Sequence, residues 1–170
     1  IFGFFVKFFN VNLFLQDIKV VAYATIFFSI ILYFSDKTPV TKTFNKNISN
    51  KNAFYIGLAQ VLALIPGTSR SGITISCARY LGFSRIDSAK FSFIISIPTL
   101  FAATVLGVGE AAINFNKDIF IFLFIGFVLS LIISLACINI FLSFVKKYSL
   151  SIFVIVRLII GFVLLFYLAN

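Results

Sequence analysis

The sequence predicts an all-α, polytopic integral membrane protein in which one helical hairpin is too short to cross the bilayer. Of its 170 residues, 61% are hydrophobic and only 11% are charged, which is more apolar surface than a soluble domain of this size can bury. Several apolar runs approach the ~20 residues that a helix needs to cross about 30 Å of hydrocarbon. No alternation of apolar and polar residues competes with these runs, so strands are not expected.

The apolar runs divide a single membrane domain, residues 1–170, into spans and loops. Residues 1–15 are apolar but interrupted by Lys7 and Asn10, and they resemble the tail of an element that begins upstream. Since residue 1 is isoleucine rather than methionine, we expect the sequence to be N-terminally truncated. Four full spans follow, with a kink expected at Pro98 in the second. They are predicted at residues 19–34, 91–108, 119–145 and 150–168.

Residues 54–83 contain two apolar runs that are each too short to span a membrane. The first run ends at Pro66, and the second begins at Ile73 after the polar sequence GTSRSG. A single span with a broken middle and a re-entrant hairpin of two half-helices both fit this pattern. The flanking segments, residues 35–52 and 79–90, are both basic. Because basic loops face the cytoplasm, we favour the hairpin, which enters and leaves on the same side.

The same rule orients the rest of the chain. The sequence holds 14 Lys and Arg against 5 Asp and Glu, an excess that indicates cytoplasmic loops rather than a nucleic-acid partner. Lys146 and Lys147 form a third basic turn, whereas the turn over residues 110–118 is net acidic. We therefore expect the basic turns in the cytoplasm, and the 110–118 turn and the C-terminus on the outer face.

The tip of the predicted hairpin has the chemistry of an anion site. Pro66 stops the first half-helix, and the second should begin near Ser71 or Gly72, with its free N–H groups and positive dipole end facing the loop. Gly67 and Gly72 allow positive φ and close approach of a ligand to the backbone. Arg70 adds a planar cation suited to phosphate. Further polar groups come from Gln60, Thr68, Ser69, Ser71 and Thr74.

Small polar residues also have a structural interpretation, because they let transmembrane helices pack closely. At the tip, Arg70 favours the anion site, since an arginine at membrane depth needs a partner. Packing is favoured for two further stripes, although the first could also border the cavity. These stripes are Ser88, Ser92, Ser96, Thr99 and Ala103, and Gly126, Ser130, Ser134 and Cys137. Arg157, in the last span, is expected to be a second cation near the anion site rather than a snorkelling side chain.

The sequence GLAQVLALIPGTSRSGITI, residues 57–75, resembles the second signature of the bacterial undecaprenyl-diphosphatase family, also called bacitracin-resistance proteins. The later segments AKFSFIISIPTLFAAT and VRLIIG agree, so the resemblance covers essentially the whole chain. It implies hydrolysis of undecaprenyl diphosphate to the monophosphate carrier lipid and inorganic phosphate. It also implies an inverted-repeat fold with two re-entrant hairpins, in the bacterial inner membrane, with a pocket open to the outer face.

The resemblance assigns roles to residues of the hairpin. Ser69 would be the nucleophile or a phosphate ligand, Arg70 would clamp the diphosphate, and Thr74 would donate a hydrogen bond to it. Gln60 and Arg157 match family positions with a supporting role. The expected substrate-binding set is completed by Gly67, Thr68, Ser71 and Gly72.

One part of the family pattern does not occur in this sequence. The family's first signature carries two glutamates four residues apart and a serine-rich turn that ends in histidine, whereas this chain has no histidine. The divalent cation that the resemblance implies, Mg²⁺ or Ca²⁺, therefore has no expected ligands here, and residues 1–170 alone are expected to be inactive. The expected partners are the polyprenyl diphosphate, membrane lipids and a second copy of the chain in a homodimer.

A membrane transporter or channel for an anionic substrate is the alternative function, since broken helices also bind anions in that class. A measurement of catalytic turnover distinguishes an enzyme from a transporter or channel. An enzyme releases phosphate from a lipid diphosphate in detergent, whereas a transporter needs two compartments.

Overall fold

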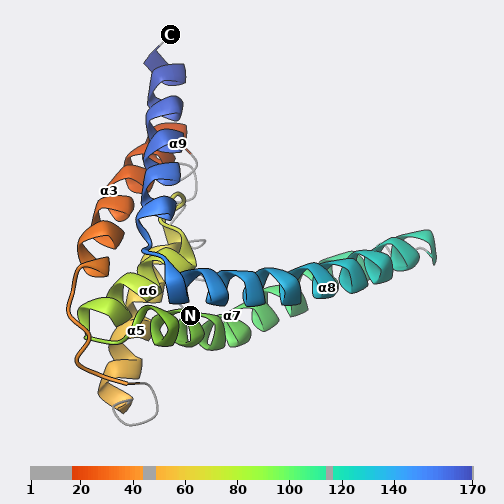
Figure 1. The fold of residues 1–170 in the computed structure, drawn as a ribbon. Helices are drawn as coiled ribbons and strands as arrows, with labels where there is room; N and C mark the ends of the chain where they lie inside the picture. The colour runs from red at the N-terminus through yellow and green to blue at the C-terminus, as the bar shows by residue number, and fades with distance from the viewer. Residues whose placement is uncertain (1–16, 44–48, 114–116, 170) are drawn as a thin grey trace.

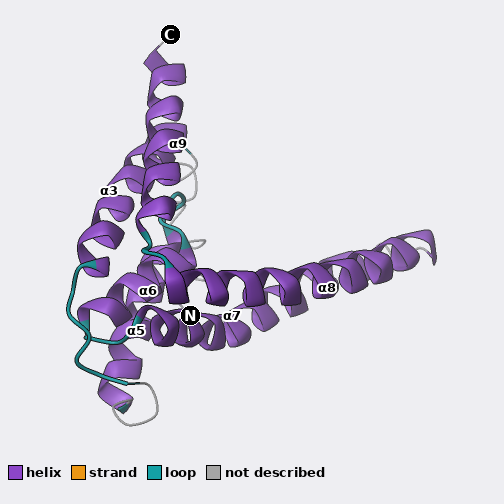
Figure 2. Cartoon of the chain, viewed as in Figure 1, coloured by secondary structure: helices purple, strands orange, loops and turns teal. Residues whose placement is uncertain are grey.

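The computed structural model describes residues 17–43, 49–113 and 117–169, and these ranges are helices joined by turns and, after α3, by a longer loop (Figure 2). The helices are α3 (Ile18–Asp36), α5 (Asn50–Val61), the 3-10 turn η1 (Leu62–Leu64), α6 (Arg70–Tyr80), α7 (Arg85–Ile113), α8 (Lys117–Lys147) and α9 (Ser151–Ala169). The all-α prediction is confirmed for these residues, whereas the predicted element in residues 1–15 lies outside them. The predicted 110–118 turn is too long, because α7 continues to Ile113 and α8 begins at Lys117, and residues 114–116 lie outside the described ranges.

Four of these helices, α3, α7, α8 and α9, are long and apolar enough to cross a membrane. The four predicted spans are therefore confirmed by length and composition, and the chain is a multi-pass membrane protein. α3, α7 and α8 extend beyond their predicted bounds at both ends, most clearly α7, which begins at Arg85 and continues through Pro98, whereas α9 is shifted by one residue.

α3 and α9 lie side by side and run antiparallel (Figure 1). Gly161 of α9 lets the two backbones approach, because a Cβ there would lie 2.5 Å from Cγ1 of Ile26. One turn of α9 earlier, Arg157 meets Ser29. The pairing therefore runs from the start of α3 to its end, where the α8–α9 turn packs against it.

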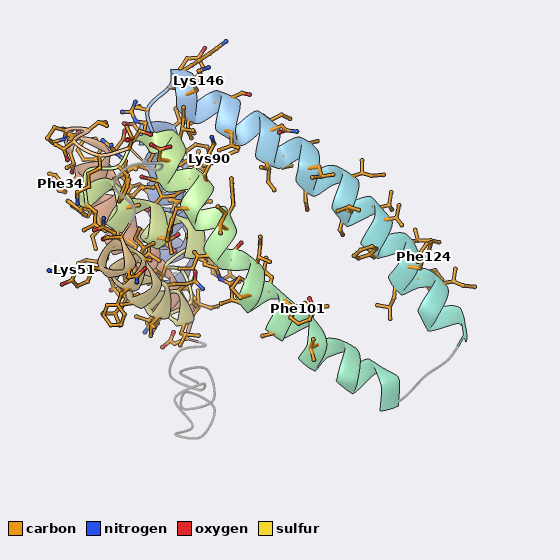
Figure 3. The ribbon with its side chains drawn as sticks, turned by 90° about the horizontal axis from the view of Figure 1, so that it is seen from below. Phe34, Lys51, Lys90, Phe101, Phe124 and Lys146 are labelled. Atoms are coloured by element: carbon orange, nitrogen blue, oxygen red, sulfur yellow. The ribbon has the colours of Figure 1, made fainter. Side chains whose placement is uncertain are left out.

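α7 and α8 form a second pair that projects away from α3 and α9 as an arm (Figures 1 and 3). Because the two helix pairs do not run parallel to each other, their arrangement does not define a single membrane normal. The membrane topology is therefore inferred from helix length, hydropathy and charge. Side chains over residues 121–137 are exposed, and a Cβ added at Gly126 would meet no atom within 4 Å. The packing predicted for the small-residue stripe of α8 thus has no partner within the described ranges.

The short helices form an antiparallel hairpin, packed against α3 and α7. At its open end, Ile56 of α5 packs with Ala78 of α6 and Phe83, and the thiol of Cys77 lies 3.6 Å from the carbonyl oxygen of Tyr55. α6 has 11 residues, so it is about 16 Å long, roughly half of the ~30 Å hydrocarbon layer. The structure therefore brings both ends of the hairpin to one side, as a re-entrant element requires, while its depth in a bilayer stays a prediction.

A buried ion cluster fastens the base of this hairpin. Asp36, the last residue of α3, accepts two hydrogen bonds from Arg85 at 2.6 and 2.9 Å and one from the N–H of Leu150 at 3.1 Å. Arg79 is only 3% exposed and donates to the carbonyl oxygens of Asp36 and Thr38. The cluster thus joins α3, α6, α7 and the start of α9.

This cluster corrects the interpretation of residues 79–90 as a basic loop. Arg79 lies inside α6, and Arg85 is the first residue of α7, so only residues 81–84 form the turn. The side chains of Arg79 and Arg85 both contact the carboxylate of Asp36, which the sequence predicts to lie in a solvated loop. The positive charges still gather at the base of the hairpin, because one carboxylate faces two guanidinium groups.

We predict that Asp36→Asn lowers the thermal unfolding temperature of the purified protein substantially. Removing one partner of a buried ion pair costs about 3–5 kcal/mol, because the remaining charge stays buried. The matched control is Asp17→Asn, since Asp17 is the exposed N-cap of α3 and asparagine caps a helix equally well. Equal unfolding temperatures for the two variants would contradict the role given to the cluster.

Accessibility labelling tests the topology. Single cysteines replace Lys51, Lys90 or Tyr167 in a background that carries Cys77→Ala and Cys137→Ala. We expect an impermeant maleimide added to intact cells to label position 167 only, because the base of the hairpin carries the positive charge. Labelling of both positions 51 and 90 from outside, with position 167 protected, would overturn the orientation. Labelling of only one of positions 51 and 90 would overturn the re-entrant hairpin.

Candidate functional site

The tip of the hairpin lies directly against α3. Gly67 has φ = +90°, and a Cβ there would collide with the carbonyl oxygen of Val21 and lie 2.9 Å from Oγ1 of Thr25. The Thr25 hydroxyl donates to the Gly67 carbonyl oxygen at 3.2 Å. Glycine is needed at this position for both its backbone conformation and its small size.

Ser69 caps the second helix of the hairpin in a conformation that is rare for a side-chain-bearing residue. Its φ is 65° and its ψ is 113°, and its Oγ accepts a hydrogen bond from the N–H of Gly72 at 3.2 Å. α6 therefore begins at Arg70, slightly earlier than predicted. Such a conformation costs about 1–3 kcal/mol and occurs preferentially at functional sites.

Arg157 reaches the tip from α9. Its Nη2 donates to the carbonyl oxygens of Gly67 at 2.8 Å and Thr68 at 2.9 Å, and its Nε donates to Oγ of Ser29 at 3.0 Å. A Cβ added at Gly72 would lie 2.9 Å from the remaining nitrogen, Nη1. The guanidinium group thus faces the start of α6, and the predicted location of Arg157 beside the tip is confirmed over snorkelling.

Arg70 and Gln60 meet on the opposite side of the tip, against α7. Nη1 of Arg70 donates to Oγ1 of Thr99 at 3.2 Å, and Nε2 of Gln60 lies 3.4 Å from the same oxygen. Arg70 itself is exposed. The two arginines therefore stand on different sides of the start of α6.

The side chain of Thr74 lies between α6 and α7, away from the guanidinium groups of Arg70 and Arg157. It is fully buried, and its hydroxyl lies 3.0 and 3.2 Å from the carbonyl oxygens of Arg70 and Ser71 and 2.7 Å from Oγ of Ser92. With these partners, Thr74 joins α6 to α7. Its predicted hydrogen bond to a diphosphate stays a prediction.

A pocket of about 310 Å³ opens beside the start of α6. Its polar end is formed by Ser69, Ser71, Gly72 and Arg157. Its apolar wall is formed by Leu32, Ile75, Phe141, Leu150, Ile152, Phe153 and Val156. The pocket thus combines residues with hydroxyl and guanidinium groups, which lie beside Gly72, with a largely apolar lining.

Two polar atoms of the tip are buried without a hydrogen-bond partner in the described ranges, namely Oγ1 of Thr68 and Oε1 of Gln60. Buried polar atoms are nearly always paired in folded proteins, so such atoms call for an explanation. A polar ligand or ordered water at the tip would supply one.

The aspartate side chains that the structure describes do not lie at the tip of the hairpin. Asp17 caps the start of α3, Asp36 belongs to the cluster at the base, and Asp87 lies in the first turn of α7. Across residues 17–43, 49–113 and 117–169, no three His, Cys, Asp or Glu side chains gather into a metal-binding group. Mg²⁺ and Ca²⁺ prefer carboxylate and carbonyl oxygens, so the described residues of the tip do not fit a divalent cation.

Two residues that contact the tip were not predicted from the sequence as part of the site. Thr25 and Ser29 in α3 hold Gly67 and Arg157, and no motif singles them out. Thr99 belongs to the stripe for which packing is favoured and a border of the cavity is the alternative. Packing is confirmed for Ser88 and Ser92, which are buried, whereas Thr99 contacts the side chains of Arg70 and Gln60 at the tip.

Fold and site together define a multi-pass membrane protein with a cationic, hydroxyl-rich broken hairpin. The family model described as Bacitracin resistance protein BacA matches residues 1–163. The chain therefore belongs to the bacitracin-resistance protein BacA family, as the motif resemblance predicted.

Curated relatives carry the name undecaprenyl-diphosphatase. The protein from Pelagibacter ubique is 41% identical over 160 residues, covering 94% of this chain and 62% of the relative. The one from Campylobacter curvus is 43% identical over 147 residues, covering 86% and 55%. The one from Aliivibrio salmonicida is 39% identical over 164 residues, covering 94% and 60%. The chain thus spans less than two thirds of the length of these relatives.

We predict that Gly67→Ala destabilises the hairpin and lowers the thermal unfolding temperature. The added Cβ would meet the backbone of α3 and would force alanine into a positive φ, a change that costs more than about 1 kcal/mol. Gly126→Ala is the matched control, because a Cβ there meets no atom within 4 Å. An unfolding temperature for Gly67→Ala equal to that of Gly126→Ala would refute the close contact between tip and α3.

Proposed function

We propose that the hairpin tip binds the diphosphate group of undecaprenyl diphosphate and that the protein hydrolyses this lipid to undecaprenyl phosphate and inorganic phosphate. The observation that carries the proposal is the start of α6, where the strained cap Ser69 stands between two guanidinium groups, those of Arg157 and Arg70. The names of the relatives support the substrate and the reaction.

Three kinds of donor converge on the proposed phosphate position. The first N–H groups of a helix lack intrahelical acceptors, and the helix dipole adds about half a positive charge there. The hydroxyls of Ser69 and Ser71 and the guanidinium of Arg157 line the same end of the pocket. The apolar wall provides hydrocarbon for the isoprenoid chain next to its headgroup.

In the proposed reaction, a water molecule attacks the terminal phosphorus and the bond to the bridging oxygen breaks. Inorganic phosphate leaves, and undecaprenyl phosphate keeps the bridging oxygen. The donors at the tip neutralise charge on the phosphoryl oxygens, which is the main protein contribution to phosphoryl transfer. The proton that the water loses goes to a group outside these tip residues.

We propose Ser69 as a phosphate ligand rather than the nucleophile. Its Oγ already accepts the N–H of Gly72, which leaves its proton to donate to a phosphate oxygen. A serine nucleophile needs a base beside it, and the described part of the tip places no carboxylate there. The chain itself contains no histidine.

The transporter or channel alternative is not favoured, because the relatives are named for a hydrolytic activity. For the location, we propose the bacterial inner membrane with the tip open to the outer face, in accord with the positive charge at the hairpin base. A homodimer and a requirement for Mg²⁺ or Ca²⁺ remain predictions of the family resemblance. Analytical ultracentrifugation tests the first, and phosphate release after treatment with EDTA tests the second.

Two substitutions of Ser69 separate its chemistry from its backbone, in protein expressed from the complete gene. Ser69→Gly should keep the unfolding temperature, because glycine adopts positive φ freely and is an adequate cap. It should nevertheless lower phosphate release from undecaprenyl diphosphate by about 10²–10³, the usual effect of losing one aimed donor. Ser69→Ala should lose both activity and stability.

The control is Ser143→Ala, at an exposed position of α8, which should change neither property. Near-normal phosphate release by Ser69→Gly would contradict the role of the hydroxyl. A labelled phosphoserine at position 69, after brief exposure to substrate carrying ³²P in its terminal phosphate, would show that Ser69 is the nucleophile.

A further inference from the structure

Thr99, on the face of α7 that packs against the hairpin, is bonded in a way that packing alone does not require. A hydroxyl has one proton to donate and two lone pairs to accept with. The Thr99 hydroxyl donates to the carbonyl oxygen of Ser96 at 2.8 Å. It accepts from Nη1 of Arg70 at 3.2 Å and from Nε2 of Gln60 at 3.4 Å. Its full hydrogen-bonding capacity is therefore in use.

The donation to Ser96 fixes the direction of the other two bonds. Because the proton of Thr99 is committed to its own helix, its oxygen meets the hairpin as an acceptor only. This orients the Gln60 amide with its nitrogen towards Thr99 and its oxygen away, where Oε1 is buried without a partner in the described ranges. The same oxygen restrains the guanidinium of Arg70, whose position at the tip is otherwise exposed.

The neighbouring contacts of α7 explain why Thr99 can act as a fixed point. Seven residues earlier, Ser92 lies 2.7 Å from the hydroxyl of Thr74 in the buried interface between α6 and α7. That contact and the burial of Ser88 and Ala89 hold α7 against the body of α6. Thr99 lies two turns further along the same face, level with the tip.

We propose that Thr99 is a positioning residue that holds the Arg70 guanidinium and the Gln60 amide in place at the phosphate site. This inference rests on the proposed function, because Arg70 is there one of the two guanidinium groups beside Ser69 at the proposed diphosphate site. A long, exposed arginine side chain loses rotamer freedom when it binds. A preset hydrogen bond to Thr99 removes part of that cost and keeps the planar fork directed at one position.

The test compares three variants in protein expressed from the complete gene. Thr99→Val keeps the shape of the side chain but removes the acceptor, and it should lower kcat by on the order of 10-fold to 100-fold, the scale of a misplaced catalytic group. Thr99→Ser keeps the hydroxyl and should stay within about threefold of the unmodified protein. The control, Thr104→Val, removes a hydroxyl of the same helix that donates to its own backbone carbonyl at Leu100, and it should change nothing.

A double-mutant comparison shows whether Thr99 acts through Arg70. In an Arg70→Lys background the fork that Thr99 restrains is gone, so Thr99→Val should have a much smaller effect on kcat than it has alone. Equal effects in both backgrounds would overturn the inference. Equal losses for Thr99→Ser and Thr99→Val would also overturn it, because the hydroxyl would then not be the cause.

A chemical readout keeps this inference separate from the proposed function. Phenylglyoxal modifies guanidinium groups, and mass spectrometry measures its rate at Arg70 alone. Thr99→Val should raise that rate several-fold, and Thr99→Ser and Thr104→Val should not, whether or not the protein hydrolyses undecaprenyl diphosphate. If no variant releases phosphate, the proposed function fails while the labelling rates still decide on Thr99, and an unchanged rate at Arg70 in Thr99→Val would overturn the inference.

Discussion

The hydrogen bonds from Arg157 to the carbonyl oxygens of Gly67 and Thr68 are the interaction on which the rest of the site depends. The first helix of the hairpin ends at Val61 and the following 3-10 turn ends at Leu64, before Pro66. The backbone between this turn and α6 therefore has carbonyl groups with no helical partner. Such groups are costly within hydrocarbon unless protein or water satisfies them. Arg157 satisfies two of them with one side chain and, in doing so, brings its charge to the start of α6. The same bonds that make the broken backbone tolerable therefore also provide one side of the proposed phosphate site.

The hairpin is fastened at both ends by polar contacts to the long helices. At the base, Asp36 holds Arg85 and the start of α9, and Arg79 donates to the backbone of the α3 end. At the tip, Ser29 of α3 accepts a hydrogen bond from Nε of Arg157, and Thr99 of α7 accepts one from Arg70. Between these ends, Ile73, Ile75 and Ala78 of α6 are buried in apolar clusters. Rigid placement suits the proposed phosphate site, because aimed donors stabilise charge only if they do not need to reorganise.

The sequence predicted the helices and the hairpin well, because these features are local. Runs of apolar residues, a proline and basic flanks define spans and breaks without any knowledge of neighbours, so the helix ends were off by only a few residues at most positions. Contacts between distant segments could not be predicted in this way. Asp36 looked like a loop acid because its partners Arg79 and Arg85 lie more than 40 residues away.

The candidate site was predicted in part for the same reason. The motif located the tip and the location of Arg157 was confirmed, but residue types alone do not say which hydroxyl faces a pocket. Thr74 and Ser69 are equally polar, yet one is buried between two helices and the other caps α6 at the pocket. Ser29 lies in no motif, and Thr99 lies in a segment to which the resemblance assigns no residue role, so their importance arises only from what lies opposite them in the fold.

The most direct test of the proposed phosphate site is an experimental structure of the protein, expressed from its complete gene, with a non-hydrolysable methylene analogue of a polyprenyl diphosphate. We predict a phosphate group within hydrogen-bonding distance of Nη1 of Arg157 and of the first backbone N–H groups of α6, with the isoprenoid chain along the apolar wall of the pocket. A diphosphate bound instead at the base of the hairpin, beside Arg85 and Lys146, with the tip occupied only by water, would contradict the account.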